Sequence, residues 1–538
     1  MDGELSPGAV ASLSVHAAAL EAPDRLALVS GPRLLPFAEL AELALATARR
    51  GGVVPSGDGT PGVARRGAAE PARGEAADGD AVWHFRAQSE LETVVQVLAA
   101  LEARRTFLPL HPKLTSREAD ALIKLAAGYR GAPAALIATS GTSGAPKLAV
   151  LDHHALLAAA LASNAHLGFQ ADDRWLLCIP LAHVGGLSIV TRCLVARKPI
   201  VVLPSFDPDA VFHAIETKRA TLLSVVPTML STLMRHPRSA ALTQLRVILV
   251  GGAAFDPALR QEARARKLRV LATYGCTEMA SQITTQRPSD AQDPRSAGGG
   301  VADSGVPLGG PDSGVPLGGS DSGVPQGVDS GVPLGGSDSG VPLGGADSGV
   351  PLGGVEVRIG GSDEDDDATH RATRRQSDPP RGGYKSRAGP ILVRGPMRMR
   401  GYVGEAELAP NAWFDTGDLG STDDSGRLYV LGRSDDVIVT GGENVQPLEV
   451  ENALRQATGV RDALVCGVPD AEWGQRVGAL LVLESGVDAE AVLGAAAHEL
   501  AGFKLPRVYC IVGELPRTRL GKPDRTSASR ALQNSSKP

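Results

Sequence analysis

Cysteine is scarce in this sequence, with five residues among 538. The five are odd in number, lie far apart and include no CxxC pair. Disulfide-stapled secreted domains need a dense, even set of cysteines, and structural zinc sites need closely spaced pairs, so neither class fits. We expect reduced thiols in the core at Cys178, Cys193, Cys276, Cys466 and Cys510.

Long apolar runs and an excess of basic residues are also missing. No apolar run reaches the roughly 18 residues that span a bilayer, and the first residues, MDGELSPGAV, lack the pattern of a signal peptide. Lys and Arg number 54 against 60 Asp and Glu, a formal net charge of -6, which is unlike proteins that bind nucleic acid through a basic surface. We therefore expect a cytoplasmic protein with no nucleic-acid partner and no membrane insertion.

The length and the hydrophobic pattern predict the fold class. A chain of 538 residues is too long for one core, so we expect two or more domains. Apolar runs of strand length alternate with helix-like stretches at 154–169 and 207–220, the second with Asp207 as its expected N-cap. This alternation predicts an α/β domain with largely parallel strands. The expected strands are AALIAT (134–139), RWLLCIPL (174–181), PIVVL (199–203), TLLSVVP (221–227) and LRVILVGG (245–252).

The last hundred or so residues contain a different mix of expected strands and helices from the region before them. ALVCGV and GALLVLE read as strands, while PLEVENALRQA and AEAVLGAAAHELAGF read as helices. We expect a small α+β domain there.

Two stretches interrupt the globular pattern. Residues 51–80 are rich in Gly, Ala, Pro, Arg and Glu, and a second stretch runs from about 286 to 389. The second contains six near-identical copies of DSGVPLGG between 303 and 354. The eight- or nine-residue period is far below that of solenoid repeats, so we expect a low-complexity loop. A β-solenoid or a Ca²⁺-binding repeat is the alternative, because Asp recurs once per copy.

The stretch ALIATSGTSGAPKLAV runs from an apolar strand into a loop of hydroxyl residues and glycines that ends at Lys147. Glycines let the backbone approach a phosphate, hydroxyl and amide groups bind its oxygens, and a lysine supplies charge. The loop is not a Walker A motif, because Ala145-Pro146 stands where Gly-Lys would be needed. An ordinary turn is the alternative for this motif alone.

Four further motifs follow in order: YGCTEMASQ (274–282), WFDTGDLG (413–420), GRSDDVIVTGGENVQPLEVE (432–451) and LPRTRLGKPDR (515–525). Taken singly, each has a structural explanation, such as a turn for Asp418 or a surface cation for Lys522. Taken together, the five motifs resemble the adenylate-forming superfamily of acyl- and aryl-CoA synthetases, peptide-synthetase adenylation domains and luciferases. The resemblance covers most of the chain outside the two interruptions. It implies a large N-terminal adenylate-forming domain (1–434) of layered sheets and helices, and a small mobile C-terminal domain (435–538).

The resemblance implies that the loop and the strand ends bind Mg²⁺ and ATP. Lys147 and the hydroxyl groups of the loop would bind the β- and γ-phosphates, Glu278 would hold Mg²⁺ and Thr277 would contact the α-phosphate. Tyr274 would stack on the base, while Asp418 and Arg433 would hold the ribose. The remaining nucleotide-site residues implied are Thr139, Ser140, Gly141, Thr142, Ser143, Gly144, Gly251, Gly252 and Ala253.

The resemblance also implies two half-reactions. Lys522 would bridge the carboxylate and the α-phosphate while pyrophosphate leaves, as charge stabilisation at phosphorus requires. Asp435 would be the hinge between the half-reactions, and Gly442 would line the entry of CoA. Catalytic roles are implied for Lys522, Glu278, Thr142 and His183.

Among the members of this superfamily, PLAHVGGLSIVTRC and YGCTEMASQ most resemble o-succinylbenzoate–CoA ligases. His183, Arg192 and Ser281 are the implied substrate residues, and an arginine suits a substrate with a second carboxylate. The structural alternatives are a surface cation for Arg192, a packed wall residue for His183 and pocket-floor packing for Ser281. The expected partners are an aromatic carboxylate and CoA, with the oligomeric state left open, a homo-oligomer included.

Three enzymatic readings follow from the motifs: an o-succinylbenzoate–CoA ligase, another aryl- or acyl-CoA ligase, and an adenylation enzyme that loads a carrier protein. A decayed core with the repeat as an interaction module is a fourth, against which the retained polar residues argue. The last repeat copy runs into VEVRIGG and resembles the superfamily's own turn before a strand. The earlier copies would then be tandem duplications of that turn.

Overall fold

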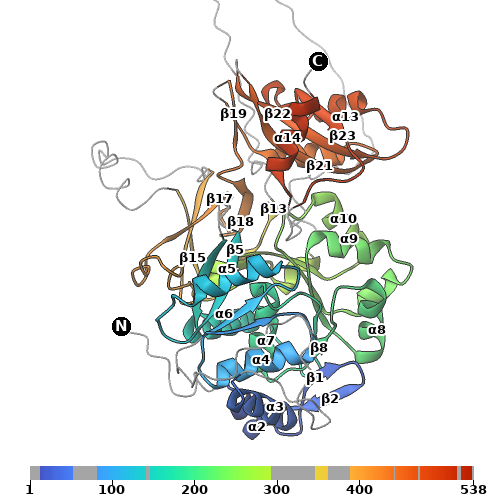
Figure 1. Cartoon of the computed structure of the whole chain (residues 1–538). Helices are drawn as coiled ribbons and strands as arrows, with labels where there is room; N and C mark the ends of the chain where they lie inside the picture. The colour runs from blue at the N-terminus through green and yellow to red at the C-terminus, as the bar shows by residue number, and fades with distance from the viewer. Residues whose placement is uncertain are drawn as a thin grey trace, which may run out of the picture.

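The computed structural model describes residues 13–51, 82–140, 146–292, 346–360, 388–441, 443–470, 473–517 and 523–535. Figure 1 shows a large N-terminal domain, drawn from blue to brown, with a smaller C-terminal domain above it in orange and red. Most of the two sequence interruptions lies outside the described residues, and the predicted repeat copies before residue 346 lie there too.

The central element of the N-terminal domain is a nine-stranded sheet of the order β14-β12-β11-β10-β9-β7-β8-β1-β2. The strands from β11 to β1 run parallel, and antiparallel strands extend the sheet at both edges. Each apolar run predicted between 174 and 252 forms one of the parallel strands, which confirms the α/β prediction. The strands are β1 (Leu26–Ser30), β2 (Arg33–Pro36), β7 (Trp175–Leu177), β8 (Ile200–Val202), β9 (Leu222–Val225), β10 (Val247–Val250), β11 (Val270–Tyr274), β12 (Thr284–Thr285) and β14 (Val350–Pro351).

Helices cover both faces of this sheet, so alternate residues of its strands lie in different apolar clusters. Trp175 and Leu177 lie in one apolar cluster, while Leu176 between them lies in the other. Asp207 caps α8 as predicted, since its carboxylate accepts from the backbone N–H groups of Asp209 and Ala210 at 2.8 and 3.3 Å. The helices are α2 (Val15–Glu21), α3 (Phe37–Arg49), α4 (Leu91–Glu102), α5 (Ser116–Ala126), α6 (His153–Leu167), α7 (Val184–Ala196), α8 (Pro208–Lys218), α9 (Pro227–Arg235) and α10 (Pro257–Ala265), with 3₁₀ turns η1 (Ser239–Gln244), η2 (Thr277–Met279) and η3 (Pro288–Gln292).

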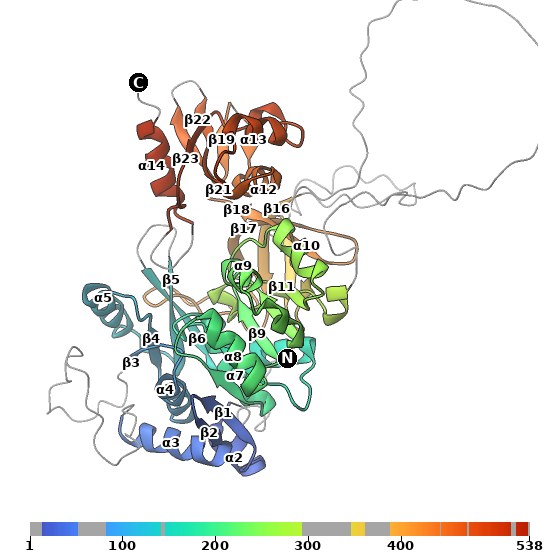
Figure 2. The same ribbon diagram turned by 90° about the vertical axis from the view of Figure 1, so that its right-hand side faces the viewer.

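Two smaller sheets complete the N-terminal domain. One has the order β3-β4-β5-β6, in which β5 and β6 form an antiparallel hairpin. The other, β13-β18-β17-β16-β15, is antiparallel throughout and lies beneath the C-terminal domain in Figure 2. Their strands are β3 (Trp83–Arg86), β4 (Phe107–Leu110), β5 (Ala134–Ser140), β6 (Pro146–Asp152), β13 (Ala346–Asp347), β15 (Glu356–Ile359), β16 (Gly389–Arg394), β17 (Phe414–Thr422) and β18 (Leu428–Arg433).

The C-terminal domain is the predicted small α+β unit. Its sheet has the order β20-β19-β22-β21, and β23 pairs with β22 in parallel. Ala463 and Val465 of β21 face one apolar cluster, whereas Leu464 and Cys466 face the other, which includes Leu532 of α14. The elements are β19 (Ile438–Thr440), β20 (Glu443–Val445), β21 (Val460–Asp470), β22 (Gly474–Leu483), β23 (Val508–Ile511), α12 (Pro447–Gln456), α13 (Ala489–Ala496), α14 (Arg525–Ser535) and the 3₁₀ turn η5 (Gly502–Lys504).

The expected interruption from about 286 to 389 begins too early, and it includes an ordered segment at 346–360. Gln286 and Asp290 are buried, at 2% and 6% exposure, and residues 346–360 supply strands to two sheets. The reason is that these polar residues are satisfied by arginine and amide partners inside the fold, which their polarity in the sequence conceals.

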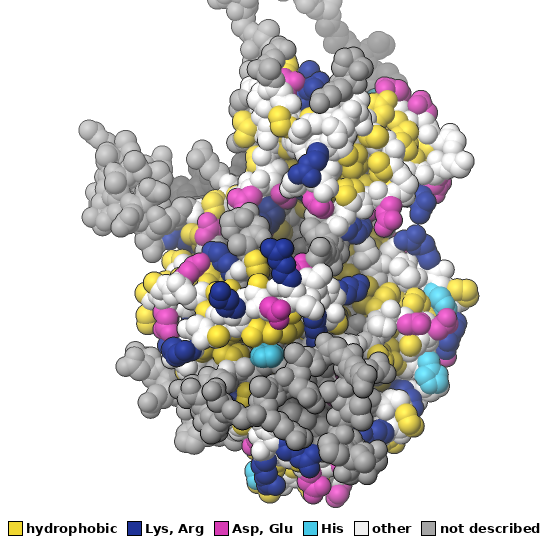
Figure 3. Space-filling view, in the orientation of Figure 1, with side chains coloured by type: hydrophobic (Ala, Val, Ile, Leu, Met, Phe, Trp, Pro, Cys, Tyr) yellow, Lys and Arg dark blue, Asp and Glu magenta, His cyan; other side chains and the backbone are white. Residues whose placement is uncertain are grey.

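The cysteines and the surface charges are arranged as the composition of the sequence led us to expect. All five cysteines are unpaired thiols, and burial raises the pKa of Cys178 to about 12. Among the described helices, none combines the length and the apolarity that crossing a membrane demands. On the face drawn in Figure 3, the basic and acidic side chains that the structure describes are interspersed.

Candidate active site

Tyr274, Asp418 and Arg433, which the sequence motifs singled out separately, meet at one point. The Tyr274 hydroxyl donates to Asp418 Oδ2 at 2.6 Å, and Arg433 Nη1 donates to Asp418 Oδ1 at 3.1 Å. Tyr274 ends β11, while Asp418 and Arg433 are paired residues on β17 and β18. The contact therefore joins the large parallel sheet to the antiparallel sheet.

The glycine of the FDTGD motif makes this arrangement possible. Gly417 has a φ of +70°, and a Cβ there would lie 2.9 Å from Arg433 Nη2. Any side chain at this position would displace the guanidinium from Asp418, besides straining the backbone. Arg433 Nη1 also donates to the Thr416 carbonyl at 3.0 Å, which fixes the orientation of the guanidinium.

Two protonated groups, the Tyr274 phenol and the Arg433 guanidinium, orient the Asp418 carboxylate. Burial, together with the charge of Asp418, raises the pKa of Tyr274 well above its ordinary value, so the phenol keeps its proton and donates it. Tyr274 thus donates to one oxygen of Asp418 and Arg433 to the other. An ionised carboxylate has about four lone-pair sites. A carboxylate held in this way can accept hydrogen bonds from a diol.

A second cluster surrounds Glu278, in the turn η2 that follows β11. The Tyr402 hydroxyl donates to Glu278 Oε1 at 2.8 Å. Lys147 Nζ lies 4.7 Å from the centre of the Tyr402 ring and 2.9 Å from Glu405 Oε1. Burial and the Glu278 charge raise the pKa of Tyr402. The predicted metal residue thus contacts the hydroxyl of Tyr402, and the predicted phosphate lysine lies over the ring of the same tyrosine.

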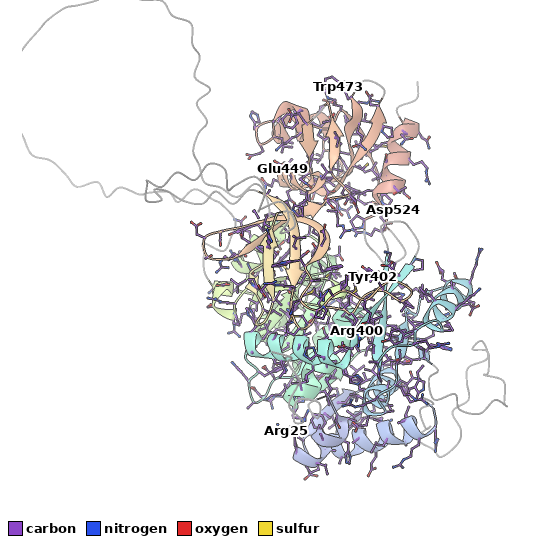
Figure 4. All side chains as sticks on the ribbon, turned by 90° about the vertical axis from the view of Figure 1, so that its left-hand side faces the viewer. Arg25, Arg400, Tyr402, Glu449, Trp473 and Asp524 are labelled. Carbon is purple, nitrogen blue, oxygen red and sulfur yellow. The ribbon has the colours of Figure 1, made fainter. Side chains whose placement is uncertain are left out.

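Sequence reasoning missed Tyr402 and Glu405. They belong to the segment between β16 and β17, in which Figure 4 labels Arg400 and Tyr402. Glu278 and Tyr402 are 124 residues apart, and no periodic pattern connects them. The one local signal is an aromatic residue between two glycines in GYVG, which is a common turn composition.

The β5–β6 hairpin carries the predicted phosphate loop. Thr139 pairs with Lys147, and Ser140 pairs with Pro146, so the two ends of the loop are held side by side. The structure therefore brings Thr139 and Lys147 together. Gly141, Thr142, Ser143, Gly144, Gly442, Lys522 and the side chain of Ser140 lie outside the described residues, and their expected roles remain predictions.

The predicted adenine wall follows β10 at the carboxyl edge of the sheet. Gly252 and Ala253 are exposed, and Gly252 has a φ of +77°. A Cβ on Gly251 would lie 2.7 Å from Thr273 Cγ2 on the adjacent strand β11. The glycines thus permit a flat surface next to the end of β11, and Thr277 lies in the turn η2 just beyond it.

Arg192 lies on α7 and is buried, with 3% exposure, so the prediction's alternative of a surface cation is wrong. Its Nη2 donates to Ser281 Oγ at 3.2 Å, and its guanidinium lies 5.4 Å from the centre of the Trp175 ring. Nε has no hydrogen-bond partner, and the described residues place no carboxylate within 4.0 Å of the group. Burial lowers the pKa of Arg192 to about 10, which leaves it charged at neutral pH.

Ser281 is held toward Arg192 by a strained turn. Ala280 and Ser281 have φ values of +51° and +117°, which side chains rarely adopt. A Cβ on Gly275 would lie 1.6 Å from the Ser281 carbonyl oxygen, so the turn packs directly on the glycine of the YGCTE motif. Gln282 anchors the next position, since it accepts from Ser163 at 2.7 Å and donates to Thr285 at 2.8 Å.

His183 precedes α7, and its ring lies 5.0 Å from that of His111, tilted by 54°. His111 was not expected at the site. Burial, followed by Lys113 and Arg86, lowers the pKa of His111. The tilted ring pair fits a packed wall residue, the alternative given for His183, as well as it fits a substrate contact.

Asp435 is exposed and lies between two anchored segments. Ser434 Oγ donates to the Gly417 carbonyl at 2.9 Å, on the N-terminal domain. Asp436 accepts from Arg525 Nε at 3.0 Å, and Arg525 also pairs with Glu451 at 2.8 Å, both within the C-terminal domain. The chain is thus fixed to one domain before Asp435 and to the other after it.

The donor set suits a nucleotide with Mg²⁺. Asp418 offers acceptors for a ribose, the glycines after β10 leave room for a base, and Glu278 offers a carboxylate. The described residues contain no cluster of three or more metal-ligating side chains. Mg²⁺ commonly takes one or two protein carboxylates and completes its shell with phosphate and water, so Glu278 and a triphosphate would be enough.

Comparisons with known proteins identify the family of the chain. The family model described as AMP-binding enzyme matches residues 129–324, and that of the AMP-binding enzyme C-terminal domain matches residues 449–522. A 2-succinylbenzoate–CoA ligase of Bacillus velezensis is 33% identical over 393 residues, 72% of this chain and 67% of the relative. An indoleacetate–CoA ligase of Aromatoleum aromaticum is 33% identical over 399 residues, 72% of this chain and 65% of the relative.

Among solved structures, the o-succinylbenzoate–CoA synthetase of Bacillus subtilis in complex with its acyl-adenylate intermediate matches with a TM-score of 0.69 and 25% identity. That match covers 96% of this chain and 97% of the other. The sequence matches span about two thirds of the curated relatives, from 65% to 68%. The chain belongs to the AMP-binding enzyme family, the family of the AMP-forming acid–CoA ligases with which it aligns.

Proposed function

We propose that the protein is an AMP-forming ligase that joins an aromatic carboxylate, o-succinylbenzoate, to CoA. In the first step a carboxylate oxygen of the acid attacks the α-phosphorus of ATP and pyrophosphate leaves. In the second step the CoA thiol attacks the acyl carbon, loses its proton and displaces AMP. ATP and CoA are intracellular substrates, so we place the reaction in the cytoplasm.

The residues of the site have separate roles in this proposal. Asp418, held by Tyr274 and Arg433, binds the ribose, while the strand ends at Gly251 and Gly252 border the base. Lys147 exchanges Glu405 for the phosphates, and Glu278 helps to hold Mg²⁺. Bound Mg²⁺ would supply charge neutralisation at the phosphates. The B. subtilis enzyme solved in complex with ATP and magnesium ion supports this part.

Arg192 is the observation that carries the choice of acid. A buried guanidinium with a hydroxyl and an aromatic ring as its neighbours has lost water without gaining an opposite charge. Binding a carboxylate would offset that loss. o-Succinylbenzoate has two carboxylates, so one can be activated while the other pairs with Arg192.

A second candidate is a ligase for another aromatic acid, and the A. aromaticum relative favours it. A monocarboxylate such as indoleacetate would leave Arg192 without a carboxylate partner once its only carboxylate is activated. For this reason we rank the dicarboxylate first. An enzyme that loads a carrier protein remains the third alternative.

A substrate panel tests the proposal. Purified protein with ATP, Mg²⁺ and CoA should release pyrophosphate and AMP with o-succinylbenzoate, and mass spectrometry should detect the CoA thioester. Benzoate, indoleacetate and a fatty acid serve as comparison acids. Turnover of one of these, with none of the dicarboxylate, would contradict our choice of acid and leave the ligase class intact.

Arg192→Met tests the role of the guanidinium directly. The methionine keeps much of the apolar volume and removes the charge, so folding should be little affected. We expect kcat/KM for o-succinylbenzoate to fall about tenfold or more, since a buried charge pair is worth at least about 1.5 kcal/mol. Benzoate, tested as a monocarboxylate at high concentration, should be affected much less.

Arg260→Met is the matched control. Arg260 is also buried, lies 4.9 Å from the centre of the Phe255 ring, and has a pKa lowered by burial to about 10. It lies on α10, where it donates to the Asp347 carbonyl and not to Ser281. Its replacement should leave the ratio of the two acids unchanged, whereas an equal shift of that ratio in both variants would remove Arg192 from the acyl site.

A further inference from the structure

The last copy of the repeat, residues 347–354, fills a slot between β12 and β18. We call this the octapeptide slot and define it by the residues that contact the copy: Arg260, Ile283, Thr284, Thr285, Gln286, Arg427 and Leu428. Asp347 is 3% exposed and is held most strongly. Its Oδ2 accepts from Gln286 at 2.7 Å and from Arg427 at 3.3 Å, while Arg260 donates to its carbonyl at 3.0 Å.

The next two residues are held by backbone contacts. Ser348 donates its N–H to the Leu428 carbonyl at 2.8 Å, and its own carbonyl accepts from Thr284 at 2.9 Å. Gly349 has a φ of +86°, and a Cβ there would lie 2.0 Å from the Thr285 carbonyl carbon. Only glycine fits this position of the slot.

The following three residues complete the fit. Val350 and Pro351 pair antiparallel with Thr285 and Thr284, and proline is tolerated because β14 is the edge strand of its sheet. Leu352 is 2% exposed, and its N–H donates to the Ile283 carbonyl at 3.0 Å. The slot therefore discriminates at Asp347, Gly349 and Leu352, and it holds the residues between them through backbone contacts.

The same six letters, DSGVPL, occur upstream, without change, in the copies that begin at Asp303, Asp312, Asp329 and Asp338. We propose that the octapeptide slot recognises the repeat unit itself and not one unique segment, so that the copy 338–345 can replace the last copy when the last copy is weakened. The copy beginning at Asp321 has Gln326 where the slot buries a leucine, so it is a poor occupant.

The last copy fills the slot in the native chain because of its continuation. Val355, which follows Gly354, is 8% exposed, and its N–H donates to the Leu352 carbonyl at 2.9 Å before the chain enters β15. A shift by one copy would extrude the nine residues 346–354 as a loop between the slot and Val355. Closing such a loop costs entropy, but the cost grows slowly with length. When the last copy is damaged, the intact neighbouring copy should therefore occupy the slot in its place.

The proposal is tested by removing the anchoring aspartate with and without intact neighbours, always in the full-length chain. Asp347→Ala alone should lower Tm only modestly, because Asp338 can take its place. The same change combined with Asp303→Ala, Asp312→Ala, Asp329→Ala and Asp338→Ala should cause a loss of Tm roughly twice that of Asp347→Ala alone, since no intact copy remains. The four upstream changes alone should leave Tm unchanged. An equal loss of Tm with and without the upstream aspartates would overturn the proposal.

Thiol labelling reads the register directly and does not depend on the size of the Tm change. Ser348 is 8% exposed, so Ser348→Cys should be protected from a thiol reagent, and Ser339→Cys, the equivalent position of the neighbouring copy, should react. Adding Asp347→Ala to each should move the protection from 348 to 339, as peptide mass mapping would show. A thiol at 348 that stays protected, or thiols at 348 and 339 that both react, would contradict register exchange.

Discussion

The hydrogen bond between Tyr274 and Asp418 allows a sharp test of the nucleotide site. Tyr274→Phe removes the hydroxyl and keeps the ring, so Asp418 loses its 2.6 Å donor while the stacking surface stays. A hydrogen bond to a charged group contributes about 1.5–3 kcal/mol, so we expect KM for ATP to rise about tenfold or more. Initial rates of pyrophosphate release at varied ATP concentration measure this.

Tyr429→Phe is the matched control for that change. Tyr429 also donates to an aspartate, Asp423, at 3.1 Å, and it lies on β18 a few residues before Arg433. Removing its hydroxyl should leave KM for ATP as it was. A comparable rise in KM from both variants would point to a general loosening of the β17–β18 pair and not to a ribose contact.

Some residues of the site could be predicted from a sequence motif, and others could not. Tyr274, Asp418 and Arg433 stood out because each lies in a short, unusual combination of Gly, acid and aromatic letters. Tyr402 had no such marker, because its partner Glu278 is brought to it by the packing of the segment between β16 and β17. The burial of Arg192 was also beyond the sequence, since α7 is apolar on all sides and an arginine in it could have faced either way.

The paired strands β3 and β4 hold two histidines whose protonation opposes folding. Burial lowers the pKa of His84, on β3, and of His111, just beyond β4. Lys113 N–H donates to His111 Nδ1 at 3.2 Å, which only the deprotonated nitrogen can accept. A histidine whose pKa is lower in the folded state takes up protons on unfolding. The free energy of unfolding is therefore unaffected by this histidine above its unfolded pKa, and it decreases as the pH drops below that pKa.

We therefore expect Tm to fall between about pH 7.5 and about pH 5.5, and to fall less in the double variant His84→Gln, His111→Gln. Scanning calorimetry or dye-monitored melting in matched buffers gives the two slopes. His213→Gln, at an exposed position on α8, controls for the loss of any histidine and should keep the full slope. If the double variant and the wild type lose the same Tm, these histidines do not set the acid limit.

The regular elements were predictable where local pattern and tertiary position agree. The parallel strands β7 to β10 lie within apolar stretches of five to eight residues because both faces of their sheet are covered, and Asp207 begins its helix by a local rule. The order of strands, with β7 between β8 and β9, was beyond sequence reasoning because it depends on how helices pack across the sheet. The edges of the low-complexity stretch were missed for a similar reason, since Asp347 is buried by Arg427 and Gln286 from distant segments.

The relation between the two domains depends on a very short connection. Ser434 is tied to Gly417 of the N-terminal domain and Asp436 to Arg525 of the C-terminal domain, so a rotation between the domains has to use the backbone of Asp435. Asp435→Pro fixes φ near about −65° and restricts the preceding residue. If the two half-reactions need different domain orientations, this variant should keep one step and lose the other.

We expect Asp435→Pro to release pyrophosphate from ATP and acid at a rate within a few-fold of wild type while CoA thioester formation falls about tenfold or more. Single-turnover assays with and without CoA separate the steps. Asp424→Pro is the matched control, because Asp424 is exposed at the second position of the turn from Asp423 to Gly426, where proline is favoured. It should leave both steps near wild type. Equal loss of both steps in Asp435→Pro, with the control active, would mean that the connection positions the domains once and does not turn between the half-reactions.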